Sequence, residues 1–370
     1  MNLVKTSRET LLRPLQAVAG IIERRHTLPI LSNVLLQRDG ARLAFVATDI
    51  EIEISADAAA EAEGADGKSL TVGARKLLDI LRALPEGAEV TLAQGEKRLQ
   101  LKSGKSRFQL QTLPPEDFPR LAAPDGAAVS LSLPQKALKG LLALVQYAMA
   151  QQDIRYYLNG LLMVIDGAEL RMVATDGHRL AVATREVAAQ EVGRQEVILP
   201  RKTIIELTKL LGDTDDPVAI ELSASQARFR FDGVLLASKL VDGKFPDYQR
   251  VIPTAHPKHL RINRQLLAQA LSRAAILTSD KFRGVRWVLG EGSLRISCTN
   301  TEQEEAQDEL DIDYKGEALD VGFNVQYLLD VLNNLDADEI DVALGDANSS
   351  ALVTVPSRTD FKYVVMPMRI

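Results

Sequence analysis

The chain of 370 residues has little of what secreted, membrane and metal-binding proteins need. Its one cysteine, Cys298, excludes an internal disulfide and leaves no second thiol for a metal site. No apolar run reaches the roughly 18 residues of a membrane span, and residues 1–10 lack the apolar core of a signal peptide. We therefore expect a protein of a reducing compartment, in the cytoplasm, with no membrane partner.

Catalytic motifs are missing as well. The four histidines, His26, His178, His256 and His259, have no metal-ligand spacing, and neither GxxxxGK[ST] nor GxGxxG occurs. Asp176 and His178 lie close together, but no serine or cysteine nucleophile motif accompanies them. A two-metal nuclease needs carboxylates that converge from several elements, which one acidic stretch does not establish. The sequence predicts no catalytic residue, no metal site and no cofactor.

The composition is that of a globular protein, 46% hydrophobic and 25% charged, with a net charge of -6. An internal repeat organises it. Residues 31–49 align without a gap with residues 158–176, at an offset of 127, and ten of the nineteen positions are identical. A further offset of 124 reaches residues 282–300, where Thr299 matches Thr48 and Thr175. Repeats of this length are domains rather than solenoid units, so we predict three, at 1–124, 125–253 and 254–370.

The first copy predicts an α+β unit. A strand at 2–6 leads to Ser7, a candidate N-cap, and to an amphipathic helix that Pro14 should bend. A turn at residues 39–40 predicts a hairpin, and a second helix is expected over 74–84. Further strands are expected at 69–72, 90–92, 98–102 and 107–112. The apolar phase of both helices recurs in the later copies, so each domain should have two helices and two antiparallel sheets.

Basic residues recur on or beside the predicted helices of all three copies. One interpretation is that they are ordinary exposed helix formers. The other is that the helices together form a basic surface that holds a duplex by its phosphates without reading bases. They are Arg8, Arg13, Arg24, Arg25, Arg75, Lys76, Lys136, Lys139, Arg201, Lys202, Lys209, Arg264 and Arg273.

A second charge asymmetry concerns the first and third copies. Residues 296–314 contain seven acids and no lysine or arginine, whereas residues 101–108 contain Lys102, Lys105 and Arg107 and no acid. An acidic strand can simply prevent edge pairing. Alternatively, the third copy of one chain meets the first copy of another, head to tail, which generates a closed ring or an open filament.

From end to end the chain resembles the bacterial DNA polymerase sliding clamp, the beta subunit of the replicative polymerase. The resemblance implies the DNA clamp fold and a crescent of three similar domains that dimerises into a ring around duplex DNA. It also implies a processivity factor, without catalysis, that tethers polymerase. The matching strings are TLPIL (27–31), SRFQLQTLP (106–114), QDIRYYLNG (152–160), VATDGHRLAV (173–182), PRK (200–202), SKLVDGKFPDY (238–248), AAIL (274–277), KFRGVR (281–286), GFNVQYLLDVL (322–332) and YVVMPMRI (363–370).

The resemblance also implies roles for individual residues. The head-to-tail subunit contact corresponds to Phe108, Leu110, Lys105 and Arg107 against Ile276, Leu277, Glu302, Glu304 and Glu305, with Gln307 in place of a family glutamate. Positions that face DNA correspond to Arg25, Gln152, Tyr156, Tyr157 and Lys202, although core packing is an equal explanation of the tyrosines. The peptide cleft corresponds to Leu158, Thr175, Gly177, His178, Arg179, Leu180, Pro246, Arg250, Val251, Asn324, Tyr327, Ser350, Val365, Met366, Pro367, Met368 and Arg369, beside Asn348 where a family member can have valine.

The implied partners are a second copy of the chain, double-stranded DNA bound independently of sequence, and proteins that carry a clamp-binding motif. These include the DNA polymerase catalytic subunit and the clamp loader. The apolar C-terminus fits a surface that accepts several peptides, with Met366 and Met368 partly exposed and Val364 inward. Two alternatives stay open: a DNA-processing enzyme built on repeats, and a scaffold ring that binds partners without loading on DNA.

Overall fold

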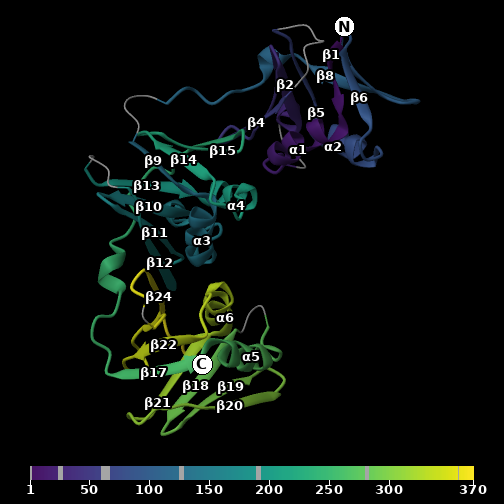
Figure 1. Cartoon of the computed structure of the whole chain (residues 1–370). Helices are drawn as coiled ribbons and strands as arrows, with labels where there is room; N and C mark the ends of the chain where they lie inside the picture. The colour runs from purple at the N-terminus through teal and green to yellow at the C-terminus, as the bar shows by residue number, and fades with distance from the viewer. Residues whose placement is uncertain are drawn as a thin grey trace. The chain divides into compact units, whose positions relative to one another are not determined.

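The structure is a computed structural model that describes residues 2–23, 28–59, 67–124, 129–188, 193–279, 283–356 and 358–370. The chain forms two compact units. The first unit contains Met1–Lys136 and Ile205–Leu240, and the second contains Ala137–Ile204 and Val241–Ile370 (Figure 1). Each is built around antiparallel sheets, and α3 (Gln135–Val145) and α4 (Arg201–Leu210) have residues in both.

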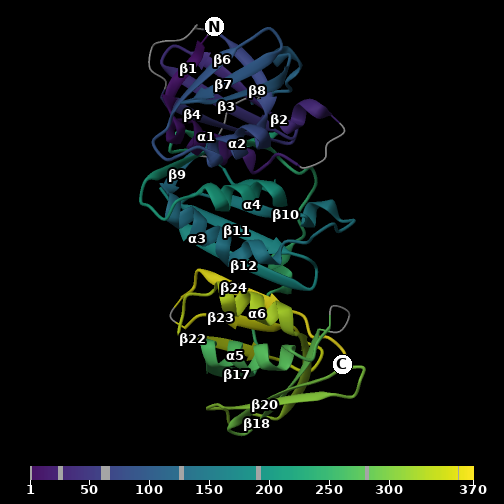
Figure 2. The ribbon, with the colours of Figure 1, turned by 90° about the vertical axis from the view of Figure 1, so that its right-hand side faces the viewer.

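The first unit has one antiparallel sheet of twelve strands in its described part. Its helices α1 (Arg8–Ala19) and α2 (Ala74–Ala83) lie side by side (Figures 1 and 2). The strands, in spatial order, are β1 (Asn2–Ser7), β6 (Glu89–Gln94), β7 (Arg98–Ser103), β8 (Ser106–Leu113), β5 (Ser69–Gly73), β2 (Asn33–Asp39), β3 (Arg42–Thr48), β4 (Ile52–Ala59), β16 (Val234–Lys239), β15 (Gln226–Phe231), β14 (Pro217–Leu222) and β9 (Val129–Pro134).

The second unit has two antiparallel sheets in its described part, and α5 (Arg264–Ala275) and α6 (Val325–Asn334) lie side by side (Figure 2). The larger sheet has the order β13 (Gln195–Pro200), β10 (Gly160–Asp166), β11 (Glu169–Thr175), β12 (Arg179–Glu186), β24 (Phe361–Val365), β23 (Ala351–Thr354), β22 (Glu339–Leu344) and β17 (Lys258–Asn263). The smaller has the order β20 (Glu305–Asp311), β19 (Ser293–Thr299), β18 (Gly284–Gly290) and β21 (Leu319–Asn324).

The threefold repeat is visible in the element bounds. β2, β3 and β4 recur 127 residues later as β10, β11 and β12, and β10 and β11 recur after a further 124 residues as β18 and β19. Over the described residues each copy supplies two helices and eight strands. The predicted α+β fold class is therefore confirmed.

Two strand pairings join neighbouring copies. β4 pairs with β16 in the first unit, and β12 pairs with β24 in the second. Because the sheets run on through these pairings, strands of the second copy belong to both units. The predicted domain boundaries stay predictions, and the first of them adjoins residues 125–128, which lie outside the described residues.

Local sequence signals explain the helix starts. The hydroxyl of Ser7 accepts a hydrogen bond from the backbone NH of Thr10, at 3.3 Å, as an N-cap should. Asn263 and Asn324 cap α5 and α6 in the same way. Pro14 is buried inside α1, which continues through it to Ala19.

Candidate functional site

The turn between β11 and β12 is held by two side chains. The hydroxyl of Thr175 donates to the carbonyl of Arg179 at 2.6 Å and accepts from the backbone NH of Gly177 at 3.1 Å. One carboxylate oxygen of Asp176 accepts from the NH groups of His178 and Arg179, at 2.9 and 3.1 Å. Gly177 has a φ of 89°, a left-handed conformation that favours glycine. These hydrogen bonds fix the backbone of the turn, and His178 is exposed on it.

The first copy has the same turn 127 residues earlier. The hydroxyl of Thr48 donates to the carbonyl of Ile52 at 2.9 Å and accepts from the NH of Ile50 at 3.0 Å. Asp49 accepts from the NH groups of Glu51 and Ile52. Ile50 occupies the position of Gly177 with a φ of 81°, which is unusual for a β-branched residue. The repeat thus preserves the backbone of the turn, and the side chains around it differ.

Beside the second-copy turn, at the β12–β24 pairing, lies a cavity of about 220 Å³, called the cleft below. Its floor is apolar, because Leu158, Leu180 and Val364 are buried members of the hydrophobic cluster beneath it. Val251 and Met366 line it and are 55% and 49% exposed. The cleft is lined by Arg155, Leu158, Thr175, Gly177, His178, Arg179, Leu180, Pro246, Asp247, Tyr248, Val251, Ser350, Val364 and Met366.

Arg179 fixes one wall of the cleft. Its guanidinium donates to Asp330 on α6 and to the carbonyl of Tyr147, both at 2.5 Å, and to Asp176 at 3.1 Å. It also lies 4.3 Å from the ring centroid of Tyr327. Burial alone lowers the pKa of Arg179, but its anionic and phenolic neighbours outweigh that effect and hold the pKa above its ordinary value. The residue therefore acts as a permanent cation that ties β12 to α6.

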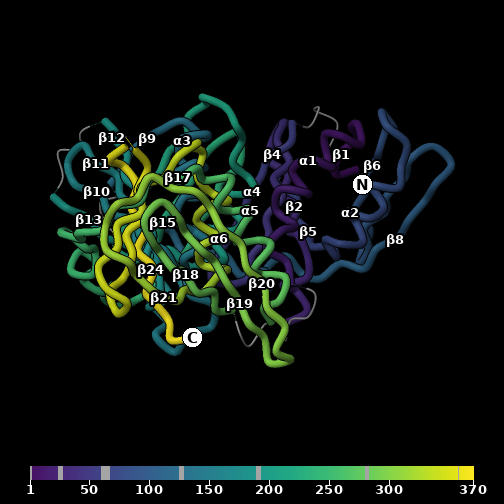
Figure 3. Tube along the Cα trace, turned by 90° about the horizontal axis from the view of Figure 1, so that it is seen from below, coloured from purple at the N-terminus to yellow at the C-terminus, as the bar shows by residue number. Residues whose placement is uncertain are grey.

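The C-terminal segment forms a second wall. The NH of Met366 donates to the carbonyl of His178 at 2.9 Å, and the NH of Met368 donates to the carbonyl of Gly322 on β21 at 2.9 Å. Figure 3 shows the C-terminus beside β21. A Cβ atom on Gly322 would lie 2.5 Å from atoms of Ile370, so glycine is needed there for the tail to approach.

Ten of the predicted cleft residues line the cleft, and the other seven do not. Arg250 is exposed and pairs with Asp247 at 2.8 Å, while Asn324 is the N-cap of α6. Tyr327 lies under Arg179, and Pro367, Met368 and Arg369 belong to the tail. Val365 is fully buried and lines a cavity of about 10 Å³ on the α5–α6 side, because neighbouring residues of a strand point to opposite faces.

Four lining residues are absent from the predicted set: Arg155, Asp247, Tyr248 and Val364. All four lie within strings on which the resemblance rests. Val364 was expected to point inward. It does, since it is 3% exposed, and the surface it supports is the floor of the cleft.

The equivalent position in the first unit is filled by an ion pair. Glu53, which is 127 residues before Leu180, accepts two hydrogen bonds from the guanidinium of Arg120, at 2.9 and 3.0 Å. It also accepts from the NH of Leu121 at 3.0 Å, and Arg120 donates to Gln37. Arg120 is equivalent to Asp247. The two pairings between copies therefore share a turn and a sheet, but the first has the Glu53–Arg120 ion pair where the second has Leu180 and Asp247.

The residues expected to face DNA lie on three elements. Gln152 is exposed with a φ of 58°, and Tyr156 is 56% exposed in η4 (Tyr156–Leu158), where its ring meets that of Tyr157 edge-on. Tyr157 is half-buried against the hydrophobic cluster, so it packs in the core as well. Lys202 is half-buried at the start of α4. Arg25 lies outside the described residues.

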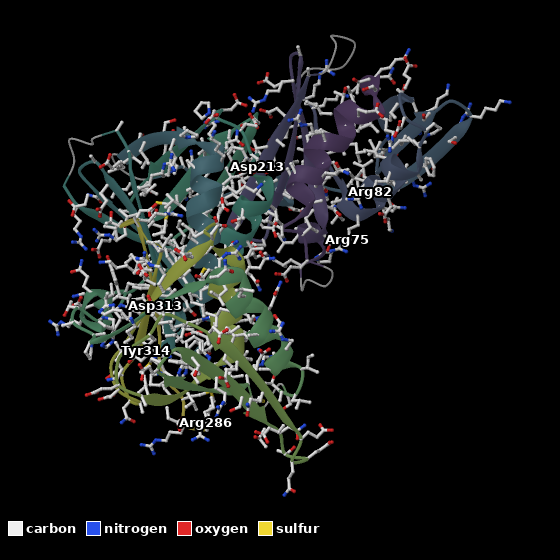
Figure 4. All side chains as sticks on the ribbon, turned by 60° about the horizontal axis from the view of Figure 1, so that its bottom comes forward. Arg75, Arg82, Asp213, Arg286, Asp313 and Tyr314 are labelled. Carbon is white, nitrogen blue, oxygen red and sulfur yellow. The ribbon has the colours of Figure 1, made fainter. Side chains whose placement is uncertain are left out.

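Charges on the helices follow the prediction in part. Figure 4 shows Arg75 and Arg82 on α2, with Arg75 donating to the carbonyl of Ile22 at 3.1 Å. Arg264 donates to the carbonyls of Ala337 and Leu332 at 2.7 and 2.8 Å. The side chains of Arg75 and Arg264 therefore bind backbone carbonyls of the chain itself.

The residues expected at the subunit contact lie on exposed edges. Phe108 and Leu110 are half-buried on β8, with Lys105 and Arg107 exposed beside them. Ile276 is 77% exposed at the end of α5 and Leu277 is half-buried. Glu302, Glu304 and Glu305 are exposed at the start of β20, and Gln307 is exposed on that strand.

Within the described ranges, no group of three His, Cys, Asp or Glu side chains could hold a metal ion. Over the same residues, no helix has the length and apolarity to cross a membrane.

Comparison with protein families matches most of the chain in three segments. Residues 1–122, 132–247 and 249–369 match the N-terminal, central and C-terminal domains of the DNA polymerase III beta subunit. The chain belongs to the DNA polymerase III beta subunit family. Curated relatives named Beta sliding clamp include those of Pseudomonas putida, 46% identical, and Vibrio cholerae, 47% identical, each over 98% of both chains.

Solved structures of beta subunits agree with this assignment. The DNA polymerase III subunit beta of Pseudomonas aeruginosa is 46% identical with a TM-score of 0.96, and both chains are covered completely. A sliding clamp from Bartonella birtlesii, bound to griselimycin, is 38% identical with a TM-score of 0.95 over the whole of both chains. The predicted family is confirmed, as is the predicted function: beta subunits are non-catalytic processivity factors of DNA polymerase.

Proposed function

We propose that two copies of this chain close into a ring around duplex DNA and that the cleft docks short apolar peptides of replication proteins. The single observation that supports this best is the apolar floor of the cleft. The same turn occurs in the first copy, where Glu53 and Arg120 fill the equivalent position. An open apolar cavity with a few polar groups around it is the usual form of a binding site.

The occupants we propose are segments of the polymerase catalytic subunit, the clamp loader and other proteins with a clamp-binding motif. Clamps of this family from P. aeruginosa and B. birtlesii have been solved with griselimycin bound. Two or three apolar anchors at about 1.5–3 kcal/mol each, less the cost of ordering a peptide, give micromolar affinity. Sixteen of the seventeen predicted cleft residues are the proposed contact set, extended by Arg155, Asp247, Tyr248 and Val364; the prediction for Val365 is wrong, because that side chain is fully buried on the opposite face of the strand.

The test is deletion of residues 366–370, with calorimetry of a polymerase docking peptide beside sedimentation of the same protein. We expect peptide binding to be lost, since Met366 lines the cleft, and the dimer to persist. A matched control lacks Ile370 only, which is outside the proposed contact set, and should keep most of the affinity. Unchanged peptide affinity in the longer deletion contradicts the proposed cleft, and loss of the dimer shows that the tail is structural first.

For the subunit contact we propose that β8 of one copy meets β20 of another, twice, head to tail. Within the described residues, β8 pairs with β7 on one side, and on its other side it pairs with β5 only at Leu113 and Thr112. The backbone of residues 106–111 is therefore open to a further strand on the side away from β7. β20 is the outermost strand of its sheet. Open edges invite strand addition, and the basic side chains of β8 complement the acidic ones near β20.

Replacing Ile276 and Leu277 with aspartate tests this contact. Ile276 is 77% exposed in the chain alone, which suits a residue that a partner covers. The double variant should sediment as a monomer at low micromolar concentration, because two anchors worth about 1.5–3 kcal/mol each are lost at each contact. Leu266→Asp, at a 53% exposed position of the same helix, is the control and should remain dimeric. A double variant that stays dimeric places the contact elsewhere.

For DNA we propose retention by topology, with Arg25, Gln152, Tyr156, Tyr157 and Lys202 making sequence-independent contacts. Direct affinity should lie in the nonspecific range of roughly 10⁻⁴ to 10⁻⁶ M and fall steeply with salt. A ring loaded on a nicked circle should stay until the circle is cut, and a linear duplex should retain it only when both ends are blocked. Equal dissociation from circular and open linear DNA contradicts a ring.

The family matches support three domains, which we place at 1–124, 125–253 and 254–370. Since a replication clamp works where the chromosome is, we place the protein in the cytoplasm.

A further inference from the structure

A second cavity, of about 810 Å³ and called the groove below, lies in the same unit as the cleft. Both cavities are lined by β12 and β24, and both include Tyr248. The groove is lined by Asp166, Ala168, Glu169, Arg171, Val182, Thr184, Arg185, Glu186, Tyr248, Gln249, Ile252, Thr254, Thr359, Asp360, Phe361 and Lys362. It is larger than the cleft, and the proposed docking of an apolar motif leaves it without a role.

Strand register places the two cavities along one face of the sheet. Thr175, Leu180 and Val364 are directly opposite one another and line the cleft. On each of these three strands, the residue two positions farther from the turn belongs to the next row: Val173 pairs with Val182, and Val182 pairs with Lys362. Two further along, Arg171 pairs with Thr184, and then Glu169 pairs with Glu186. Residues two apart on a strand share a face, so one sheet surface changes from apolar at the cleft to polar in the groove.

The segment around η5 (Tyr248–Val251) crosses the middle of this face. Tyr248 is 7% exposed and packs in the hydrophobic cluster with Val173 and Val182, and Ile252 packs beside it. The hydroxyl of Tyr248 accepts a hydrogen bond from Arg171 at 2.9 Å. Tyr248 therefore lines both cavities, and its hydroxyl is bonded to a residue of the groove.

The chemistry of the groove suits a polar peptide in an extended conformation. Thr184, Thr254 and Thr359 offer hydroxyl groups and Gln249 an amide, which can hydrogen-bond a peptide backbone. Charges of both signs are present: Arg171 is paired with Glu169, and Lys362 is exposed. The groove also has apolar lining residues, Val182, Ile252 and Phe361, so its surface is mixed, whereas the cleft has fewer polar groups.

We propose that the groove binds the polar residues that flank the docking motif of a partner peptide, so that one partner segment occupies both cavities. This inference rests on the proposed function of the cleft. Leu180 and Thr184 are four residues apart on β12, or roughly 13 Å, which about four extended peptide residues span. Once the motif is anchored, the flanking residues bind at high local concentration, so weak polar contacts add to the affinity.

Calorimetry with three peptides from the docking segment of a replicative polymerase tests the inference. The first contains the apolar motif alone, and the other two add eight native residues at its N-terminal or C-terminal side. One extended peptide should bind the wild-type protein about tenfold more tightly than the motif alone. Thr184→Tyr, which narrows the groove, and Lys362→Glu, which reverses an exposed charge, should remove most of that gain and leave the affinity of the motif unchanged.

Lys315→Glu is the matched control, because Lys315 is exposed and lines neither cavity. It should keep the tenfold gain. Equal affinity of all three peptides for the wild-type protein overturns the groove and leaves the cleft intact. A loss of motif affinity in the two groove variants also overturns it, since the cavities are then not separate sites. Failure of the motif itself to bind overturns the cleft and the groove together.

Discussion

At the β4–β16 pairing, Glu53 and Arg120 occupy the positions that Leu180 and Asp247 take beside the β12–β24 pairing. This difference predicts which substitutions should fill the cleft. Leu180→Glu with Asp247→Arg transfers the Glu53–Arg120 pair of the first unit to the equivalent positions of the second. Leu180 is 3% exposed, and Glu53 is 7% exposed with both carboxylate oxygens hydrogen-bonded to Arg120. The double variant should therefore fold with a filled cleft.

The magnitudes follow from burial. Leu180→Glu alone forfeits about 1.5–3 kcal/mol of apolar burial and adds about 1–3 kcal/mol for a buried carboxylate without a partner. We expect the free energy of unfolding to fall by about 3–5 kcal/mol. In the double variant the guanidinium supplies that partner, and a paired buried charge is close to neutral relative to a hydrophobic residue, so most of this loss should be recovered. Asp247→Arg alone breaks an exposed pair with Arg250 and should cost less than about 1 kcal/mol.

The assay is a double-mutant cycle in urea, followed by the fluorescence of Trp287. This residue is the one tryptophan of the sequence, is 2% exposed, and lies in the same unit as the cleft. The coupling between the two substitutions should be about 2–3 kcal/mol in favour of the double variant. Calorimetry should show that the stable double variant has lost at least about tenfold in affinity for a docking peptide, as expected when one anchor is excluded. A double variant no more stable than the single one, or one that binds peptide normally, would refute the equivalence of the two positions.

Three further predictions concern the turn and its neighbours. Arg179→Ala should lower the free energy of unfolding by about 3–5 kcal/mol, because the carboxylates of Asp176 and Asp330 lose the cation that pairs with them. In the same urea titration, Arg179→Lys should lose less stability. Gly177→Ala should cost roughly 1–3 kcal/mol and weaken peptide binding in calorimetry, since φ is 89° and the new Cβ would lie 2.9 Å from the guanidinium of Arg155. Hydrogen bonds from the side chain and the backbone NH of Arg155 lower the pKa of Asp153 to about 2. The contribution of Asp153 to stability is therefore present above its ordinary pKa of 3.8 and is lost as the pH falls towards 2. In an NMR titration, Arg155→Gln should raise the pKa of Asp153.

The sequence by itself determined the local elements and their repetition. Caps and turns depend on neighbouring residues, so Ser7 was identified as an N-cap and the expected strands and helices agree with the observed ones to within a residue or two. The offset of 127 carries β2, β3 and β4 onto β10, β11 and β12 because residues of one type at one spacing make the same turn. Eight of the ten cleft residues that came together belong to strings identified by resemblance, and the other two, Val251 and Ser350, lie outside them.

Only the tertiary structure decided which of the repeated turns has a cleft. Leu180 and Val364 are 184 positions apart and become neighbours through the β12–β24 register, and Arg179 reaches Asp330 across 151 positions. The same holds for Val365, which shares the apolar C-terminal strand with Val364 but points to the opposite face, and for Tyr248, which lines both cavities. Strand register and the face that a side chain takes arise from pairing between distant segments, and local periodicity carries no information about either.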